Sequence, residues 1–337
     1  MSIKQSPRIA ITMGDINGIG PEILAKALAH HQVRASCRVV VAGCPHAMQA
    51  ARAQIPECPP LPEVTDPLAC TMDNAAVVHA CGLEAPEVRP GVLDADAGRC
   101  AVEWLKTAVG WALEGSVDAV VTCPINKVGI HAAGYSYPGH TEILAELCGG
   151  PEWRMSLFAD HLRIVHVSGH LSLRQALDAL TTERIAESIR IGHEALERLK
   201  LPRRRIAVAG LNPHAGEEGA FGDEEKTLIA PAIAQCRAEG IDCHGPCSPD
   251  AVFRQGYEGE WDLVVAMYHD QGHIALKMVE MDCGVNVTLG LPIVRTSVDH
   301  GTAYDIAGKG IAREDSLVAA IRLAVALNAG QAAVERT

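Results

Sequence analysis

Short runs of β-branched and other apolar residues alternate along this chain with stretches of helical spacing. The runs predict buried strands at residues 8–12, 38–42, 118–122, 163–167, 205–210 and 262–267. Apolar residues three and four positions apart predict helices over residues 21–28, 102–113, 143–147, 185–199 and 316–329. Residues 56–90 are rich in proline and predict an irregular segment. Strands that alternate with helices indicate an α/β fold with a mostly parallel sheet.

Three of the predicted strands end in loops of small residues that contain a histidine, namely His170, His214 and His269. Because parallel strands place their carboxyl ends at one edge of a sheet, we expect these side chains to lie close together. Three imidazoles leave a position open on a catalytic divalent cation. The pattern predicts a metal site, although one such histidine alone is more typical of a structural residue. His273 is expected to support the ligands, and the remaining histidines to be structural.

Residues 266–312 concentrate polar side chains of mixed chemistry on short segments separated by glycines, which indicates a site on loops at strand ends. Lys277, Asn286 and Arg295 supply two cations and an amide, and Arg295 can hold a phosphate or carboxylate through two hydrogen bonds. This trio favours an anionic, oxygen-rich substrate. The alternative is a set of exposed charges. His140, beside a helix that Thr141 is expected to cap, suits a phosphate, and an ordinary capping loop is the alternative.

The loop after the first predicted strand has two glycines, Gly18 and Gly20, at the first two positions of a dinucleotide-binding motif. Ile23 stands where the third glycine belongs, so the match is weak. Pro21 and Glu22 suit the first turn of a helix, because proline has a fixed φ and the carboxylate complements the helix dipole. We therefore interpret the segment as a strand–loop–helix bend near a site.

The composition is that of a globular protein large enough for two domains, with 337 residues of which 48% are hydrophobic and 21% charged. The formal net charge of -12 disfavours a nucleic-acid partner. It still permits a phosphorylated small molecule, because a local cluster of cations outweighs the global charge. The 12 cysteines are scattered, and the tightest group, Cys243 to Cys247, lacks a second pair of metal ligands. With neither a secretory signal nor an apolar run that could span a membrane, we expect a cytoplasmic protein with reduced thiols.

Motifs along nearly the whole chain resemble those of the 4-hydroxythreonine-4-phosphate dehydrogenase family, which includes D-threonate and D-erythronate 4-phosphate dehydrogenases. The segments that carry the resemblance read NGIGPE, GHTE, GLNPHAGE, MYHDQG, GVNVTLGLP, RTSVDHGTA and DIAGKG. The resemblance implies a two-lobed α/β/α fold like that of isocitrate and isopropylmalate dehydrogenases, with the active site in the inter-domain cleft. Residues 1–130 and 291–337 would form the lobe with the cofactor loop. Residues 131–290 would form the lobe with the metal ligands and the dimer interface.

The same resemblance implies a metal-dependent oxidation, with decarboxylation, of 4-phosphooxy-L-threonine to 3-amino-2-oxopropyl phosphate in pyridoxal phosphate (pyridoxine) biosynthesis. The cofactor would be NAD or NADP, and its loop contains His300, Gly301, Thr302 and Asp305. A divalent metal, zinc, magnesium or cobalt, would lie at the interface of a homodimer. Its ligands would be His170 and His214 of one chain and His269 of the other.

The family's substrate-binding positions fall on His140, Thr141, Lys277, Asn286 and Arg295. Lys277 and the metal would lower the pKa of the substrate hydroxyl, and hydride would pass to the nicotinamide. The resulting 3-oxo acid would then lose carbon dioxide readily. Asp270 is the candidate for moving the proton.

Two departures from the biosynthetic enzymes leave the substrate open. Residues 168–170 read Ser-Gly-His where those enzymes usually have Thr-Thr-His, and residues 272–277 resemble relatives that oxidise D-threonate or D-erythronate 4-phosphate. A dihydrodiol dehydrogenase is less favoured, because that branch lacks the His-Thr pair and the Asn and Arg positions. A zinc hydrolase would need no cofactor loop after Asp299. A non-catalytic metal or sugar-phosphate binding protein remains a third class.

Overall fold

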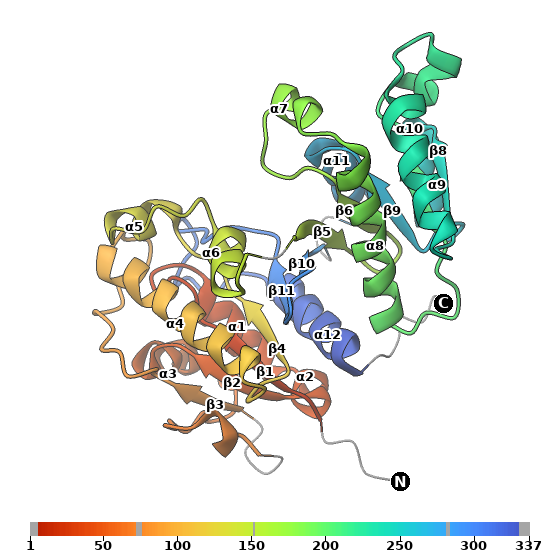
Figure 1. Cartoon of the computed structure of the whole chain (residues 1–337). Helices are drawn as coiled ribbons and strands as arrows, with labels where there is room; N and C mark the ends of the chain where they lie inside the picture. The colour runs from red at the N-terminus through yellow and green to blue at the C-terminus, as the bar shows by residue number, and fades with distance from the viewer. Residues whose placement is uncertain (1–5, 72–75, 151, 281–283, 330–337) are drawn as a thin grey trace. The chain divides into compact units, whose positions relative to one another are not determined.

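The computed structural model describes residues 6–71, 76–150, 152–280 and 284–329 (Figure 1). The chain forms two compact units. The first consists of Met1–Pro151 together with Leu291–Asn328, and the second contains Glu152–Gly290. In this division the helix that begins at His140 belongs to the first unit, whereas the sequence analysis assigned residues 131–150 to the second lobe.

The first unit is built on a parallel sheet with the strand order β3-β2-β1-β4-β11. Its strands are β1 (Arg8–Thr12), β2 (Arg38–Ala42), β3 (Ala76–His79), β4 (Ala119–Thr122) and β11 (Val294–Val298). From β1 the chain adds β2 and β3 on one side, and β4 then pairs with the other side of β1. This reversal makes the carboxyl ends of β1 and β4 the switch point at which open α/β sheets form their ligand crevices.

Helices surround the strands of the first unit because each presents an apolar side to the core. They are α1 (Gly20–Ala29), α2 (His31–Ser36), α3 (Pro45–Gln54), α4 (Ala95–Leu113), α5 (Lys127–Ala132), α6 (His140–Leu147), α12 (Asp315–Ala329) and the short turn η1 (Pro67–Ala69). Helix α1 has a proline and Glu22 in its first turn, as predicted. Helix α4 is capped by the Asp94 carboxylate and buries Trp104 completely. Thr296 on β11 donates a hydrogen bond to the Ala320 carbonyl of α12, which fixes that helix on the sheet.

The second unit contains a mixed sheet in the order β10-β5-β6-β9-β7-β8. Its strands are β5 (Arg154–Phe158), β6 (Arg163–His166), β7 (Ile206–Ala209), β8 (Cys243–Cys247), β9 (Leu263–Ala266) and β10 (Val285–Leu289). Strand β5 runs antiparallel to β10 and β6, whereas β6, β9, β7 and β8 are parallel. The carboxyl ends of β6, β9 and β7 therefore lie side by side at one edge.

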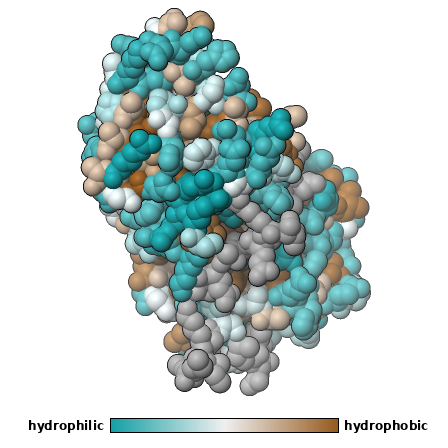
Figure 2. Space-filling view, turned by 90° about the vertical axis from the view of Figure 1, so that its right-hand side faces the viewer, coloured by the Kyte–Doolittle hydropathy of each residue, from teal (hydrophilic) through white to brown (hydrophobic). Residues whose placement is uncertain are grey.

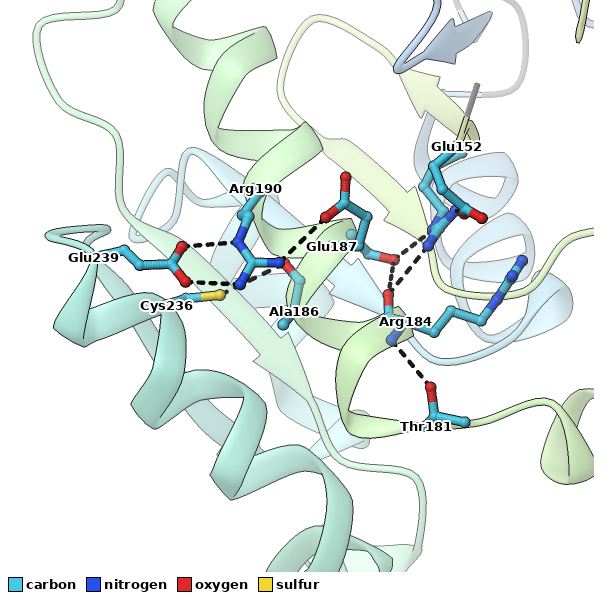
Figure 3. Close-up of polar contacts among 10 residues, drawn as sticks. Glu152, Thr181, Arg184, Ala186, Glu187, Arg190, Cys236 and Glu239 are labelled. Atoms are coloured by element: carbon cyan, nitrogen blue, oxygen red, sulfur yellow. Dashed lines mark hydrogen bonds and ion pairs between the residues drawn. The ribbon is translucent and has the colours of Figure 1, made fainter. Parts of the chain in front are cut away.

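Helices and turns of the second unit connect these strands. They are α7 (Leu173–Asp178), α8 (Thr182–Arg198), η2 (Pro213–Gly219), η3 (Glu225–Ile229), α9 (Ala230–Ala238), α10 (Pro249–Tyr257) and α11 (His269–Glu280). Figure 3 shows how α8 is held: the Thr181 side chain accepts from the Arg184 amide at 3.1 Å, and Arg190 donates to both oxygens of Glu239 at 2.7 Å. Because Glu239 follows α9, this two-bond ion pair joins α8 to the end of α9.

The secondary structure confirms the predicted strands and helices and corrects two details. Strand β3 lies inside the segment predicted to be irregular, because proline-rich flanks masked the short apolar run Ala76–His79. Helix α6 begins at His140 with Gly139 as its N-cap and no side-chain cap, so the prediction that Thr141 caps it was wrong. The eleven cysteines within the described ranges form no disulfide bond, and Cys283 lies outside those ranges.

Large hydrophobic side chains are exposed on two neighbouring elements of the second unit. Leu173 and Leu177 of α7 are 59% and 45% exposed, and Ile274 and Met278 of α11 are 63% and 79% exposed. On the face drawn in Figure 2, hydrophobic residues are interspersed among hydrophilic ones. In the parts of the chain that the structure describes, no helix combines the length and the apolar character needed to cross a membrane.

Candidate active site

The first unit places a buried cation beside its switch point. Arg295 on β11 is only 2% exposed and donates a hydrogen bond from Nη2 to the Thr122 hydroxyl of β4 at 2.7 Å. Burial lowers the pKa of Arg295 to about 9, and the nearby Glu142 carboxylate raises it in part. The side chain is therefore still a cation near neutral pH. A buried guanidinium offers charge-assisted donors in a fixed planar geometry, so this position suits an anionic ligand.

His140 lies close enough to Arg295 to respond to its charge. Burial, and then the positive charge of Arg295, hold the pKa of His140 well below its usual value, so the ring is neutral. The residue as a whole is half-buried, but its Nε2 atom is buried and has no hydrogen-bond partner within the described residues. A buried polar atom of this kind is a position where a ligand can complete the hydrogen bonding. Thr141 follows on the first turn of α6 and is also half-buried.

The predicted cofactor loop joins β11 to α12 in the same unit. His300 and Asp305 are exposed on it, and the Nδ1 atom of His300 lies 3.1 Å from the Gly301 carbonyl oxygen. Thr302 is half-buried, and its carbonyl accepts a hydrogen bond from the Ile19 amide at 3.0 Å. The loop therefore presents polar side chains to solvent while its backbone is tied to the segment that follows β1.

The second unit brings two of the three predicted metal ligands together. His170 follows β6 and His269 begins α11, and their ring centroids are 5.4 Å apart. Both line a cavity of about 260 Å³, together with Gly169, Leu171, Leu173, Ala176, Tyr268 and Asp270. The Nδ1 atom of His269 lies 2.6 Å from the Asp270 carboxylate. A carboxylate on one ring nitrogen leaves the other free to bind a metal, as in many carboxylate–histidine–metal arrangements.

Two further histidines support His269 from behind. The ring of His273 stacks on the ring of His269, with the centroids 3.7 Å apart and an angle of 11° between the ring planes. The Nδ1 atom of His273 lies 3.2 Å from Nε2 of His166. The opposite nitrogen of His166 lies 3.1 Å from the Met155 carbonyl oxygen. Burial, and then the charge of His273, lower the pKa of His166 to about 3, so its ring stays neutral. A Cβ on Gly272 would lie 2.4 Å from His166 Nε2, so only glycine fits there.

His214 lies apart from this pair in the contacts that the structure shows. Its side chain is 64% exposed and its Nδ1 atom is 3.8 Å from the Asp250 carboxylate. Over the described ranges, no three side chains of His, Cys, Asp or Glu are grouped so as to hold a metal ion. The chemistry of His170 and His269 fits a divalent cation, and a complete set needs at least one further ligand.

The turn that bears His214 is left-handed. Residues 214–218 all have positive φ, with 52° at His214 and 40° at Glu217. Each non-glycine residue in this conformation costs roughly 1–2 kcal/mol. The buried Glu225 carboxylate offsets part of this cost, because it accepts from the backbone amides of Leu211 and Asn212 at 2.8 Å. Strained backbone held by buried contacts is typical of functional sites.

Replacing Glu225 with glutamine is expected to reduce the free energy of unfolding by about 1–3 kcal/mol, because the charge-assisted bonds to the turn are weakened. Burial raises the pKa of Glu225, but the hydrogen bonds from Asn212 outweigh it and leave the pKa below the usual 4.5. The stabilisation is therefore fully present above pH 4.5 and is lost as pH falls through the folded pKa.

Urea unfolding from pH 3 to pH 8 would measure both effects. The control is Glu258→Gln, which changes an exposed ion pair on α10. Equal stability of the two variants would contradict the role of Glu225.

Three other predicted residues lie on or beside the same elements. Lys277 is exposed on α11, two turns after His269, and Asn286 is half-buried on β10 opposite Leu157 of β5. Asp270 is 71% exposed, and its hydrogen bond with His269 lowers its pKa. A carboxylate that stays ionised is better suited to orienting His269 than to accepting a proton, which argues for a positioning role.

Sequence analysis did not single out four residues that the structure ties to these groups: Asp15, Tyr304, Glu225 and His166. Glu225 lies on the π-helical turn η3, and no local motif links it to His214. His166 was assigned to the structural histidines, and its position at the end of β6 was the available signal. Asp15 lies just before the motif NGIGPE and Tyr304 lies between RTSVDHGTA and DIAGKG, and their contact joins residues that are 289 positions apart.

Two α/β units with a candidate anion site and candidate metal ligands are typical of an enzyme that acts on a small anionic substrate. Curated relatives identify its kind. D-threonate 4-phosphate dehydrogenase of Salmonella typhimurium is 46% identical over 328 residues, which are 96% of this chain and 99% of that protein. The 4-hydroxythreonine-4-phosphate dehydrogenase of Geobacter metallireducens is 46% identical over 321 residues, 94% of each chain.

Solved structures agree with the relatives. The crystal structure of 4-hydroxythreonine-4-phosphate dehydrogenase from Klebsiella pneumoniae has a TM-score of 0.84 and 45% identity, and the match covers 95% of this chain and 100% of that one. A β-decarboxylating dehydrogenase of Thermococcus kodakarensis shares the fold at 16% identity, with a TM-score of 0.50 and coverage of 94% and 81%. These matches confirm the predicted fold class.

A family model described as pyridoxal phosphate biosynthetic protein PdxA matches residues 35–324. The chain belongs to this PdxA family. It is therefore a dehydrogenase that acts on a CH–OH group, as the resemblance of its motifs implied.

Proposed function

We propose that this dehydrogenase oxidises a phosphorylated four-carbon hydroxy acid with NAD or NADP and a divalent metal, and that the product then loses carbon dioxide. The observation that carries the proposal is the buried Arg295, whose guanidinium reaches Thr122 at the carboxyl end of β4, close to the neutral His140. A cation held in this way favours a phosphate or carboxylate. The family's cofactor loop follows β11 in the same unit.

The substrate that fits best is D-threonate 4-phosphate or D-erythronate 4-phosphate. These acids have a hydroxyl at C2, where 4-phosphooxy-L-threonine has an ammonium group. Residues 168–170, which read Ser-Gly-His, depart from the biosynthetic enzymes, and residues 272–277 resemble relatives that oxidise these sugar-acid phosphates. The relative from Salmonella typhimurium supports this choice. The biosynthetic substrate remains the second candidate because the relative from Geobacter metallireducens is equally similar.

The chain's own residues would divide the work. Arg295, oriented by Thr122, would hold an anionic end of the substrate. The neutral His140 would form one hydrogen bond with the same anionic group. Lys277, with Asn286, would place a positive charge beside the substrate hydroxyl and favour its ionisation. Asp270 would hold the His269 ring. When bound, the nicotinamide accepts the hydride and the metal acts as a Lewis acid on the substrate oxygen.

We propose that the active protein is a cytoplasmic homodimer whose second copy completes the metal site. Two features support a second copy. First, among the described residues of one chain, only two of the three proposed metal ligands, His170 and His269, lie close together. The adjoining helix α11 exposes Ile274 and Met278, which a partner would cover. Of zinc, magnesium and cobalt, the imidazole ligands favour zinc, because magnesium prefers oxygen ligands. Cysteines that form no disulfide bond among the described residues fit a reducing compartment.

A substrate panel tests the proposal. Metal-loaded protein is offered D-threonate 4-phosphate, D-erythronate 4-phosphate and 4-phosphooxy-L-threonine with each nicotinamide, and reduced cofactor is followed by absorbance. We expect a kcat/KM of about 10⁴–10⁵ M⁻¹ s⁻¹ for at least one sugar-acid phosphate, and a value at least about tenfold lower for the amino acid phosphate.

Unphosphorylated D-threonate serves as the matched control and should be a poor substrate. A preference for the amino acid phosphate would establish the biosynthetic activity instead. No turnover of any phosphorylated compound by metal-loaded protein would refute the proposed function.

A further inference from the structure

The glycine-rich segment that follows β1, residues 13–22, contacts both ends of the predicted cofactor loop, residues 299–312. At the near end, the Tyr304 hydroxyl donates to the Asp15 carboxylate at 2.5 Å. The Ile19 amide donates to the Thr302 carbonyl at 3.0 Å. Asp15 is 1% exposed, and its other oxygen accepts from the Asn17 amide at 2.9 Å. The segment therefore fixes one side chain and one carbonyl of the loop.

The far end of the loop is held by an ion pair on α1 between the buried Glu22 and the partly exposed Lys26. Glu22, 5% exposed, accepts from the backbone amides of Gly310 at 3.1 Å and Ala312 at 2.7 Å. Lys26, 3.0 Å from Glu22, donates to the carbonyls of the same two residues at 3.0 and 2.5 Å. The two side chains thus satisfy both the donors and the acceptors of this backbone. Hydrogen bonds between a charged side chain and the backbone are about twice as strong as hydrogen bonds between two neutral groups.

The glycines of the segment serve this contact. A Cβ on Gly18 would lie 2.9 Å from both the Cβ and the carbonyl oxygen of Thr302. A Cβ on Gly20 would lie 2.2 Å from the Met13 carbonyl oxygen within the segment's own turn. These glycines therefore allow two stretches of backbone to approach each other.

We propose that residues 13–22 form a clamp that holds the cofactor loop in its binding conformation before the cofactor arrives. Asp15, through Tyr304, and Glu22 are then positioning residues for the nicotinamide cofactor. The inference rests on the proposed function of the loop. A loop that is already ordered does not lose conformational freedom when it binds, so the clamp strengthens binding without contributing to hydride transfer. Its loss should weaken cofactor binding and leave the chemical step unchanged.

The test compares Tyr304→Phe and Glu22→Gln with the wild type. Phenylalanine removes one hydroxyl, and glutamine leaves one of the two carboxylate acceptors. Hydrogen exchange by mass spectrometry should be about tenfold faster over residues 299–314 in each variant. The Kd for NAD or NADP should rise about tenfold, and kcat at saturating cofactor should stay within about twofold of the wild type.

Tyr135→Phe is the matched control. Its hydroxyl donates to the Glu103 carboxylate at 2.6 Å in the same unit, away from the loop. This variant should have the wild-type rate of hydrogen exchange in the loop and the wild-type Kd for the cofactor. If the folded Tyr304→Phe and Glu22→Gln variants show wild-type hydrogen exchange in the loop and the wild-type Kd for the cofactor, the proposed clamp is wrong. Failure of the wild type to bind any nicotinamide would instead refute the proposed cofactor, and the exchange rates would still show whether the clamp holds the loop.

Discussion

Replacing Arg295 with methionine is expected to raise the KM for the phosphorylated substrate by about 100- to 1,000-fold, with a smaller effect on kcat. The reason is that the guanidinium is 2% exposed and is oriented by Thr122, so it can hold an anion through two hydrogen bonds in a dry environment. Methionine has a similar length but neither the charge nor the donors. Steady-state kinetics with the best substrate of the panel would measure the change.

Stability separates a binding role for Arg295 from a structural one. An apolar side chain in place of a buried ion often leaves stability unchanged or raises it by about 1–4 kcal/mol. The variant should therefore have an equal or higher Tm while its KM rises. Arg322→Met is the matched control, because Arg322 is exposed on α12 and donates to Gln32 at 2.6 Å. A lower Tm with an unchanged KM would show that Arg295 is only structural.

Replacing His269 with alanine is expected to abolish tight metal binding and to reduce kcat at least about 1,000-fold, because a Lewis acid contributes several kcal/mol to such a reaction. Metal content after gel filtration gives a readout that does not depend on turnover. Asp270→Asn keeps the ring but weakens its hydrogen-bonded support, so metal affinity should fall about 10- to 100-fold. Retention of stoichiometric metal by the His269→Ala variant would contradict its role as a ligand.

Mixed dimers test whether the metal site is shared between chains. Inactive His214→Ala and His269→Ala proteins, unfolded and refolded together, should recover about a quarter of wild-type activity if these histidines act from different subunits of a twofold dimer. Mixed refolding with a single variant gives the background. No recovery, in dimers shown to have exchanged subunits, would place both histidines in one chain.

Periodicity in the sequence predicted most of the fold, because each buried element contains its own apolar pattern. Strands β1, β2, β4, β6, β7 and β9 are visible in this way. The short strand β3 was not, since its run of four residues lies between prolines, and β5, β8, β10 and β11 were not predicted either. Pattern alone also could not find the boundary at residue 151, because the helix α6 before it looks like any other amphipathic helix.

The candidate site could be predicted only where its chemistry is local. His170 and His269 follow the ends of strands β6 and β9. Because these strands are parallel neighbours, the ring centroids of the two histidines are 5.4 Å apart. The conformation of the His214 turn could not be foreseen, since five successive residues with positive φ depend on a buried carboxylate further along the chain. The pairing of Asp15 with Tyr304 is equally non-local.

The discontinuous make-up of the first unit has a consequence for synthesis on the ribosome. Strand β11 and helix α12 come from the end of the chain, so a nascent protein that stops before residue 291 exposes an unpaired edge of β4. The contiguous residues 152–290 contain their own strands, β5 to β10, by then. The unit whose translation begins first is therefore the last to be completed, and until then its open edge is a site for chaperone binding or aggregation.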